Sequence, residues 1–377
     1  MKTSFADIAT KGVQGLTPYQ PGKPVEELER ELGITDSIKL ASNENPLGPS
    51  EKVQQVLEQH LKNLHLYPDG GGFKLREKLS EVHDVTSASI TLGNGSNDVL
   101  ELIARAFLTD KDSAVYSEYA FAVYPLVVQA IGAKAQIAKA YTSDHISMPY
   151  GHDLDAIFNA IDETTKIVFI ANPNNPTGTW LDVNDLHDFL SRVDENVIVV
   201  LDEAYFEYMP EDLKPSSIDW LAEFSNLIIT RTFSKIHALA GLRIGYAVSS
   251  ESVADLLNRV RQPFNVNTLA QDAAFAALDD EDHIEQSVAL NNAGLFQLKQ
   301  SLDKMNLTSI PTIGNFITVD VKHDGQAIYN DLLKEGVIVR PVGNYGLPNH
   351  LRITVGSRQQ NERVIAALKK VLGEAAK

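Results

Sequence analysis

The residues best suited to chemistry lie close together after the apolar run 226–230. This run predicts a buried strand, so the side chains that follow it should emerge at a strand's carboxyl end, where open α/β sheets bind ligands. Lys235 stands there, with Thr232 and Ser234 before it and Arg243 after it. An amine in this position can form a Schiff base, and the hydroxyls and the guanidinium can hold a phosphate. Taken alone, the same residues also fit a solvated lysine near a turn.

Other polar residues follow predicted strands in the same way: Gly95, Ser96 and Asn97 after 90–92, Asn175 after 167–171, and Asp202 and Tyr205 after 197–201. Carboxyl ends of parallel strands meet at one edge, so these side chains should converge on Lys235. A buried Asp202 can pair with a protonated ring nitrogen, Asn175 and Tyr205 can bind a ring hydroxyl, and the loop before a helix can bind an anion. Each of these residues has a role if the ligand is a phosphorylated pyridine aldehyde. The structural alternatives are helix N-caps for Ser96, Asn97 and Asp202 and a core aromatic for Tyr205.

The order of the predicted elements indicates an α/β fold with a mostly parallel seven-stranded sheet, helices on both faces and a smaller α+β domain. The predicted strands are 90–92, 114–116, 135–138, 167–171, 197–201, 227–230 and 244–248. Helix-length segments mostly separate them. Amphipathic helices at 268–278 and 284–302 and a strand-rich tail follow. We therefore expect an arm at 1–45 that packs with the small domain, a large domain at 46–263 and a small domain at 264–377.

Composition excludes several classes of function. The 377 residues carry a net charge of −17, which disfavours nucleic acid and anionic lipid as partners, and the chain has no cysteine. No apolar run approaches the length of a membrane span, and residues 1–14 lack a signal-peptide core, so we expect a cytoplasmic protein. The histidines, including His60, His65, His145 and His152, lack metal-ligand spacing and are expected at the surface or in loops, with no metal site.

Three motifs carry a resemblance to a known family: Asn-Pro-Asn-Asn-Pro-Thr-Gly at 172–178, Asp-Glu-Ala-Tyr at 202–205, and Thr-Phe-Ser-Lys with Ala-Gly-Leu-Arg-Ile-Gly at 232–245. They resemble those of pyridoxal-phosphate enzymes of the aspartate aminotransferase fold type. From Leu16 to the C-terminal helix the chain more closely resembles the histidinol-phosphate aminotransferases. The resemblance implies the type I fold of these enzymes and pyridoxal 5'-phosphate as cofactor.

The resemblance also implies a role for each matching residue. Lys235 corresponds to the Schiff-base lysine, Asp202 to the partner of the pyridine nitrogen, and Tyr205 and Asn175 to the ligands of the ring hydroxyl. The phosphate cup corresponds to Ser96 and Asn97, beside Gly95, and to Thr232, Ser234 and Arg243. Phe121 or Tyr119 stacks on the ring, and Tyr67 reaches the cofactor of a neighbouring subunit, which implies a homodimer with shared sites. Arg352 binds the substrate's anionic group, with Arg340 and Tyr19 as helpers.

The implied reaction is transamination in histidine biosynthesis. Glutamate donates an amino group to the cofactor and leaves as 2-oxoglutarate, and imidazole-acetol phosphate is then aminated to histidinol phosphate, with Lys235 as proton carrier. Two alternatives share the motifs: an aminotransferase for phenylalanine and tyrosine, and a threonine-phosphate decarboxylase. A non-catalytic regulator that binds the cofactor is a further alternative, although the acidic chain lacks a basic helix-turn-helix pattern.

Overall fold

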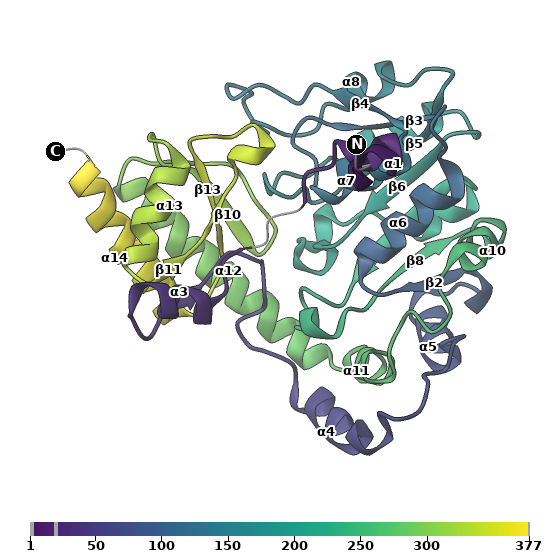
Figure 1. The fold of residues 1–377 in the computed structure, drawn as a ribbon, viewed down its shortest axis with the longest axis horizontal. Coiled ribbons are helices and arrows are strands. Elements are labelled where there is room, and N and C mark those ends of the chain that lie inside the picture. The colour runs from purple at the N-terminus through teal and green to yellow at the C-terminus, as the bar shows by residue number, and fades with distance from the viewer. Residues whose placement is uncertain (1–3, 19–21, 376–377) are drawn as a thin grey trace.

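The computed structural model describes residues 4–18 and 22–375. The chain forms a large part around one sheet and a smaller part that contains the C-terminus (Figure 1). The long helix α12 (Glu281–Lys304) runs from the large part into the small part. None of the helices in the described ranges is both long enough and apolar enough to cross a membrane.

The large part is built on a seven-stranded sheet with the strand order β2-β8-β7-β6-β5-β3-β4. Its strands are β2 (Ile90–Gly93), β3 (Ser113–Ser117), β4 (Lys134–Ala138), β5 (Thr165–Ala171), β6 (Ile198–Asp202), β7 (Leu227–Thr232) and β8 (Gly245–Ser249). Only β8 runs antiparallel to its neighbours. Each of the seven predicted runs forms a strand. Since most are buried on both faces, they are continuous apolar runs without a polar alternation.

Helices cover both faces of this sheet. Helices α6 (Ser96–Phe107), α7 (Val123–Ile131) and α10 (Glu251–Val260) pack on one face, where Ile167 and Phe169 of β5 point. Helices α8 (Leu154–Asn159) and α9 (Val183–Arg192) pack on the other, against Val168 and Ile170. Successive side chains of β5 thus point to opposite cores, which follows from the two-residue period of a strand. The result is a rigid sheet whose carboxyl edge can hold side chains in fixed positions.

The small part has its own sheet and core. Its antiparallel sheet has the order β12-β13-β10-β9, with β9 (Thr308–Ser309), β10 (Phe316–Asp320), β12 (Arg340–Pro341) and β13 (His350–Thr354). Helices α12, α13 (Gly325–Lys334) and α14 (Arg358–Ala375) cover it around a buried aliphatic core. The short strands β1 (Ile38–Lys39) and β11 (Val337–Ile338) pair in parallel, so the segment before residue 40 is fixed to this part. Helix α3 (Val25–Leu32) packs there as well, through Leu28.

Two segments pack differently from the domain limits expected from sequence. Helix α11 (Thr268–Ala277) was expected in the small domain, but its buried alanine face packs against β2 and helices α4 (Glu51–His60) and α5 (Phe73–His83) of the large part. Helix periodicity located α11 but could not tell which core its small side chains would enter. The expected arm is also divided between the two parts. Its first helices are α1 (Phe5–Ile8) and α2 (Lys11–Gln14), and α2 packs on α7 of the large part.

Candidate active site

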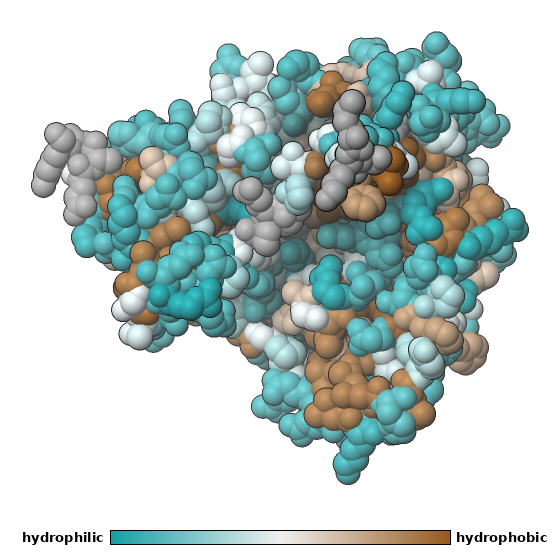
Figure 2. Space-filling model, viewed as in Figure 1, coloured by the Kyte–Doolittle hydropathy of each residue, from teal (hydrophilic) through white to brown (hydrophobic). Residues whose placement is uncertain are grey.

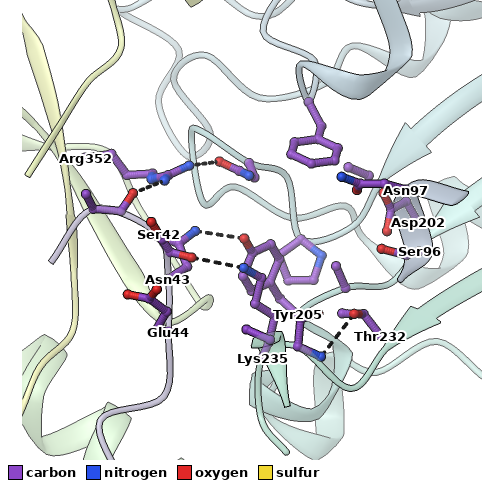
Figure 3. A pocket seen from close by; sticks show the side chains of 18 of the residues that line it. Ser42, Asn43, Glu44, Ser96, Asn97, Asp202, Tyr205, Thr232, Lys235 and Arg352 are labelled. Carbon is purple, nitrogen blue, oxygen red and sulfur yellow. Dashed lines mark hydrogen bonds between the residues drawn. The ribbon is translucent and has the colours of Figure 1, made fainter. Parts of the chain in front are cut away.

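A cavity of about 260 Å³ lies where the carboxyl edge of the large sheet faces the small part (Figure 3). Eleven of the residues predicted from sequence line it: Ser96, Asn97, Phe121, Asn175, Asp202, Tyr205, Thr232, Ser234, Lys235, Arg243 and Arg352. They come from segments that are far apart in the chain. The structure therefore brings together an amine, a carboxylate, a phenol and several anion-binding groups, as the placement of the strands predicted.

Lys235 stands three residues beyond the end of β7 and is partly buried. Its Nζ donates a hydrogen bond to the carbonyl oxygen of Ser42 at 3.1 Å. Burial lowers the pKa of Lys235 to about 8, and the positive charges of Arg352 and Arg243 act in the same direction. A lysine with a pKa near neutrality has a useful fraction of neutral amine, which is the form that attacks a carbonyl carbon.

Asp202 closes β6 and is 4% exposed. Its Oδ2 accepts a hydrogen bond from the Tyr124 hydroxyl at 2.8 Å, whereas Oδ1 has no hydrogen-bond partner among the described residues. Burial raises the pKa of Asp202 to about 6. A buried carboxylate oxygen without a partner is costly, so its place in the cavity wall fits a ligand that donates a hydrogen bond, such as a protonated ring nitrogen.

The anion-binding side of the cavity combines a helix N-terminus with Arg243. Ser96 and Asn97 begin α6, whose first N–H groups are free to bind an anion. The Arg243 guanidinium donates to the Ala240 carbonyl oxygen at 2.9 Å and lies 3.4 Å from Ser234 Oγ. Gly95 has φ +82°, and a Cβ there would lie 2.4 Å from Arg243 Nη2, so only glycine lets the loop and the guanidinium approach. Thr232 completes this wall.

Hydrogen bonds connect the remaining predicted residues to the small part. Arg352 of β13 donates through Nη1 to Asn175 Oδ1 and through Nη2 to the carbonyl oxygen of Ala41 at 2.7 Å. Tyr205 is 3% exposed, its hydroxyl accepts a hydrogen bond from Asn43 Nδ2 at 2.8 Å, and burial raises its pKa to about 12. Both Asn175 and Tyr205 thus have fixed orientations towards the cavity.

The structure distinguishes between the two candidate stacking residues. Phe121 lines the cavity and makes an edge contact with Tyr124 at a centroid distance of 5.9 Å. Tyr119 packs instead against Tyr150, with ring centroids 5.5 Å apart. The side chain that can cover a ring in the cavity is therefore Phe121.

Two further predicted residues, Tyr67 and Arg340, do not line the cavity. Tyr67 is 83% exposed and its ring lies 4.9 Å from that of Phe264. Arg340 is buried beside the cavity on β12, directly opposite Arg352 in the register of β12 and β13, so both side chains leave the same face of the sheet. Tyr19 lies outside the described residues.

Sequence reasoning missed the segment Ala41–Glu44 and Tyr345, which also line the cavity. No local pattern identifies Asn43, because its side chain and backbone contact Tyr205 and Thr354, which are far away in the sequence. His152 was expected at the surface or in a loop, and it lies between β4 and α8, outside the named strands, with its side chain buried. This histidine is 6% exposed, and burial holds its pKa at about 4 while Nε2 lies 3.1 Å from the Ala171 carbonyl oxygen.

Comparisons with known proteins decide the family. The model of the aminotransferase class I and II family matches residues 35–368. Histidinol-phosphate aminotransferase 1 of Idiomarina loihiensis is 52% identical over 97% of this chain and 98% of its own length. The chain belongs to the histidinol-phosphate aminotransferase family. Histidinol-phosphate aminotransferase 2 of Pseudomonas aeruginosa is 53% identical over 98% of this chain and 99% of its own.

Solved structures of the family agree with the fold described above. The crystal structure of histidinol-phosphate aminotransferase from Sinorhizobium meliloti, in complex with pyridoxal-5'-phosphate, has a TM-score of 0.89 and 27% sequence identity. The alignment covers 97% of this chain and 98% of the other. The likeness thus extends over both the large and the small part of the molecule.

Proposed function

We propose that the chain is a pyridoxal-phosphate-dependent histidinol-phosphate aminotransferase. The observation that carries the proposal is the convergence of Lys235, Asp202 and an anion-binding loop in one cavity that Arg352 closes from the small part. When bound there, the cofactor supplies an electrophilic carbon for amines and an electron sink for the bond-breaking step. The unpaired Asp202 Oδ1 and the approach of Arg243 to Gly95 support the fit of a phosphorylated pyridine ring.

The proposed roles of the chain's residues follow from their positions. Lys235 Nζ would hold the cofactor and, once the substrate amine has replaced it, would take the proton from the substrate carbon that carries the amino group and return it within the cavity, which a pKa near 8 permits. Asp202 keeps the ring nitrogen protonated, and Asn175 and Tyr205 bind the ring oxygen. Phe121 covers the ring and excludes water from one face. The phosphate is bound by Ser96, Asn97, Thr232, Ser234 and Arg243, with Gly95 making room for the guanidinium.

Arg352 is the proposed anchor for the anionic group of each substrate. Its planar guanidinium can pair with the phosphate of histidinol phosphate or the α-carboxylate of glutamate, so one residue can serve both half-reactions. Arg340 and Tyr19 are proposed helpers, and the shared sheet face of Arg340 and Arg352 supports the first of these assignments. The relatives are named histidinol-phosphate aminotransferases, and these names do not favour the alternatives left open by the sequence analysis, such as an aromatic aminotransferase.

A substrate panel tests this proposal. Protein reconstituted with pyridoxal phosphate should convert histidinol phosphate and 2-oxoglutarate into imidazole-acetol phosphate and glutamate, with ping-pong kinetics. We expect kcat/KM for histidinol phosphate to exceed that for phenylalanine at least about tenfold, a difference of roughly 1.4 kcal/mol in transition-state stabilisation. A preference for phenylalanine, or release of carbon dioxide without 2-oxoglutarate, would contradict the proposal.

A homodimer with shared sites is proposed from an exposed apolar patch. The patch consists of Leu61, Leu64, Leu66, Tyr67, Phe73 and Phe264, whose exposed fractions run from 47% to 83%. Figure 2 shows brown atoms gathered near the bottom of the view, around α4 and α5. Such a concentration of apolar side chains is typical of a surface covered by another protein. In the dimer Tyr67 would reach the phosphate side of the partner's cavity, as the family resemblance implies.

We also propose a cytoplasmic location and a division into two domains. The acidic chain and its small-molecule substrates support the first. Separate buried cores on the two sheets support the second, with the domain limit at the start of α12, because α11 contributes its side chains to the core of the large part.

A further inference from the structure

We propose that Asn43 is a positioning residue that fixes the direction of the Tyr205 hydroxyl, so that the phenol donates its single proton to the ring oxygen of the cofactor. The inference rests on the proposed function, because the ring oxygen belongs to that cofactor. It assigns a role to a residue of the linker between the two domains, outside the motifs that identify the family.

The contact between Asn43 and Tyr205 is buried and direct. Asn43 Nδ2 lies 2.8 Å from the Tyr205 hydroxyl oxygen, and the two residues are 1% and 3% exposed. In Figure 3 the Asn43 side chain points from the linker towards Tyr205, beside Lys235. Because water is excluded from this contact, the amide is the group that decides how the phenol is hydrogen-bonded on this side.

The orientation of the Asn43 amide follows from its bonds to Thr354. The backbone N–H of Asn43 donates to Thr354 Oγ1 at 2.9 Å, and the Thr354 hydroxyl in turn donates to Asn43 Oδ1 at 3.2 Å. The amide oxygen is therefore occupied by Thr354, and the NH₂ group faces Tyr205. Since an amide nitrogen only donates, the phenol oxygen must accept from Asn43.

This acceptance determines where the phenol proton goes. A tyrosine hydroxyl has one hydrogen, and with Asn43 as donor this hydrogen remains available to the cavity that Tyr205 lines. There it can stabilise negative charge on a ring oxygen. A carboxylate at position 43 would instead accept the phenol proton and turn it away from the cavity.

The linker around Asn43 is held from both domains. Asn43 has φ +55°, a left-handed conformation, and its carbonyl oxygen accepts from Asn315 Nδ2 at 3.0 Å. The two preceding carbonyl groups, those of Ala41 and Ser42, accept from Arg352 and Lys235. Asn, Asp and Gly all tolerate positive φ, so substitutions among them change the side chain without forcing the backbone.

The test compares Asn43→Asp and Asn43→Gly in the wild-type and Tyr205→Phe backgrounds. The readouts are the pH midpoint of the cofactor's absorbance change in the holoenzyme and the cofactor dissociation constant. We expect Asn43→Asp to raise the midpoint by about one pH unit and weaken cofactor binding about tenfold, the size of one charge-assisted hydrogen bond. Asn43→Gly should fall between Asn43→Asp and wild type. In the Tyr205→Phe background Asn43→Gly should add no further shift, and Asn43→Asp should add only the part of its shift that comes from the carboxylate charge.

Two outcomes would overturn the inference: an unchanged midpoint in Asn43→Asp, or a full additional shift without the Tyr205 hydroxyl. If the Asn43 variants do not fold, Thr354→Val and Thr354→Ser carry the same test. The valine removes the hydroxyl that orients the amide, so it should shift the midpoint in the same direction as Asn43→Asp. The serine keeps the hydroxyl, so it should leave the midpoint at the wild-type value. A wild-type protein that stays colourless with pyridoxal phosphate would instead contradict the proposed function.

Discussion

The Lys235 ammonium group lies 3.1 Å from the carbonyl oxygen of Ser42, in the linker that joins the large and small parts of the molecule. This single backbone acceptor is weak compensation for a buried charge, and Arg352 and Arg243 add repulsion. Lys235 in the folded protein therefore binds its proton less tightly than a lysine side chain in water does. Only the deprotonated amine attacks a carbonyl, so the pKa of Lys235 should determine how fast the protein reacts with its cofactor at a given pH.

The rate of cofactor reconstitution should rise with pH through a midpoint of about 8, the pKa to which burial and the neighbouring arginines lower Lys235. Arg352→Gln removes one of the repelling charges, so the midpoint should move up, towards the ordinary lysine value. Stopped-flow absorbance of cofactor-free protein mixed with pyridoxal phosphate, recorded as a function of pH, measures the midpoint in the wild type and in the variant. Arg192→Gln, an equal charge change at an exposed ion pair with Asp155, should leave the midpoint in place. An identical midpoint in Arg352→Gln would contradict the electrostatic explanation.

Asp202→Asn should change the pH dependence of stability in the cofactor-free protein. Burial raises the pKa of Asp202 from 3.8 to about 6, so between these values the folded state holds a proton that the unfolded state releases. The free energy of unfolding therefore falls as pH rises through this window, by roughly 2 to 3 kcal/mol at about 1.4 kcal/mol per pKa unit. Asparagine does not titrate, so this fall should disappear in the variant.

Urea unfolding of both proteins at pH 4.5 and 6.5 measures the difference. The exposed Asp110→Asn should keep the wild-type slope. With the cofactor bound, Asp202→Asn should also lose activity, by about 10²-fold or more, because the amide cannot hold the ring nitrogen in its protonated form. Equal pH slopes in wild type and Asp202→Asn would show that the carboxyl is not the titrating group.

Short-range patterns predicted the sheet and the residues at its edge. Apolar runs such as 197–201 must be buried, and a polar residue that ends such a run, such as Asp202, can emerge only at the sheet's edge. Asn43 and Tyr345 have no such local signature. Asn43 is defined by contacts with Tyr205 and Thr354, and the latter is 311 residues away. Long-range pairs of this kind depend on how the large and small parts pack together, which hydrophobic periodicity does not encode.

Helix α11 illustrates the same limit in the fold. Its helical period was readable, but its buried side chains are mostly alanines, such as Ala270 and Ala274, which fit any closely packed core. They pack beside β2 because the chain turns back onto the large sheet before α12 begins. The periodic pattern predicts an element and its buried face, whereas the neighbour of that face is a property of the whole chain.

Substitution of Arg352 should impair both half-reactions. Arg352→Gln removes the guanidinium that Asn175 and Ala41 hold in place. We expect kcat/KM to fall by about 10²-fold for histidinol phosphate and equally for glutamate. This is the effect of losing a charge-assisted ion pair worth about 3 kcal/mol. Arg352→Lys should retain part of the activity. Single-turnover absorbance changes separate the two half-reactions. Arg259→Gln, at an exposed helix ion pair, is the matched control. Loss of only one half-reaction would contradict a shared anchor.

Shared sites predict complementation between two inactive variants. Lys235→Ala should lack activity and the absorbance band of the lysine-bound cofactor, and Tyr67→Ala should bind the cofactor weakly. In a mixed dimer one cavity combines the intact Lys235 of one subunit with the partner's intact Tyr67, so random mixing should restore roughly a quarter of the wild-type sites.

The measurement is activity after the two purified variants are unfolded and refolded together at low cofactor concentration. Lys235→Ala refolded with Lys235→Arg is the control, since no combination of these subunits contains an intact lysine. Recovery equal to the sum of the separate variants would contradict shared sites. A third variant, Leu64→Asp, places a charge in the exposed apolar patch, and burying it in a dimer interface without a partner would be costly. It should reduce both dimerisation, measured by sedimentation, and the recovered activity, which connects the patch to the site.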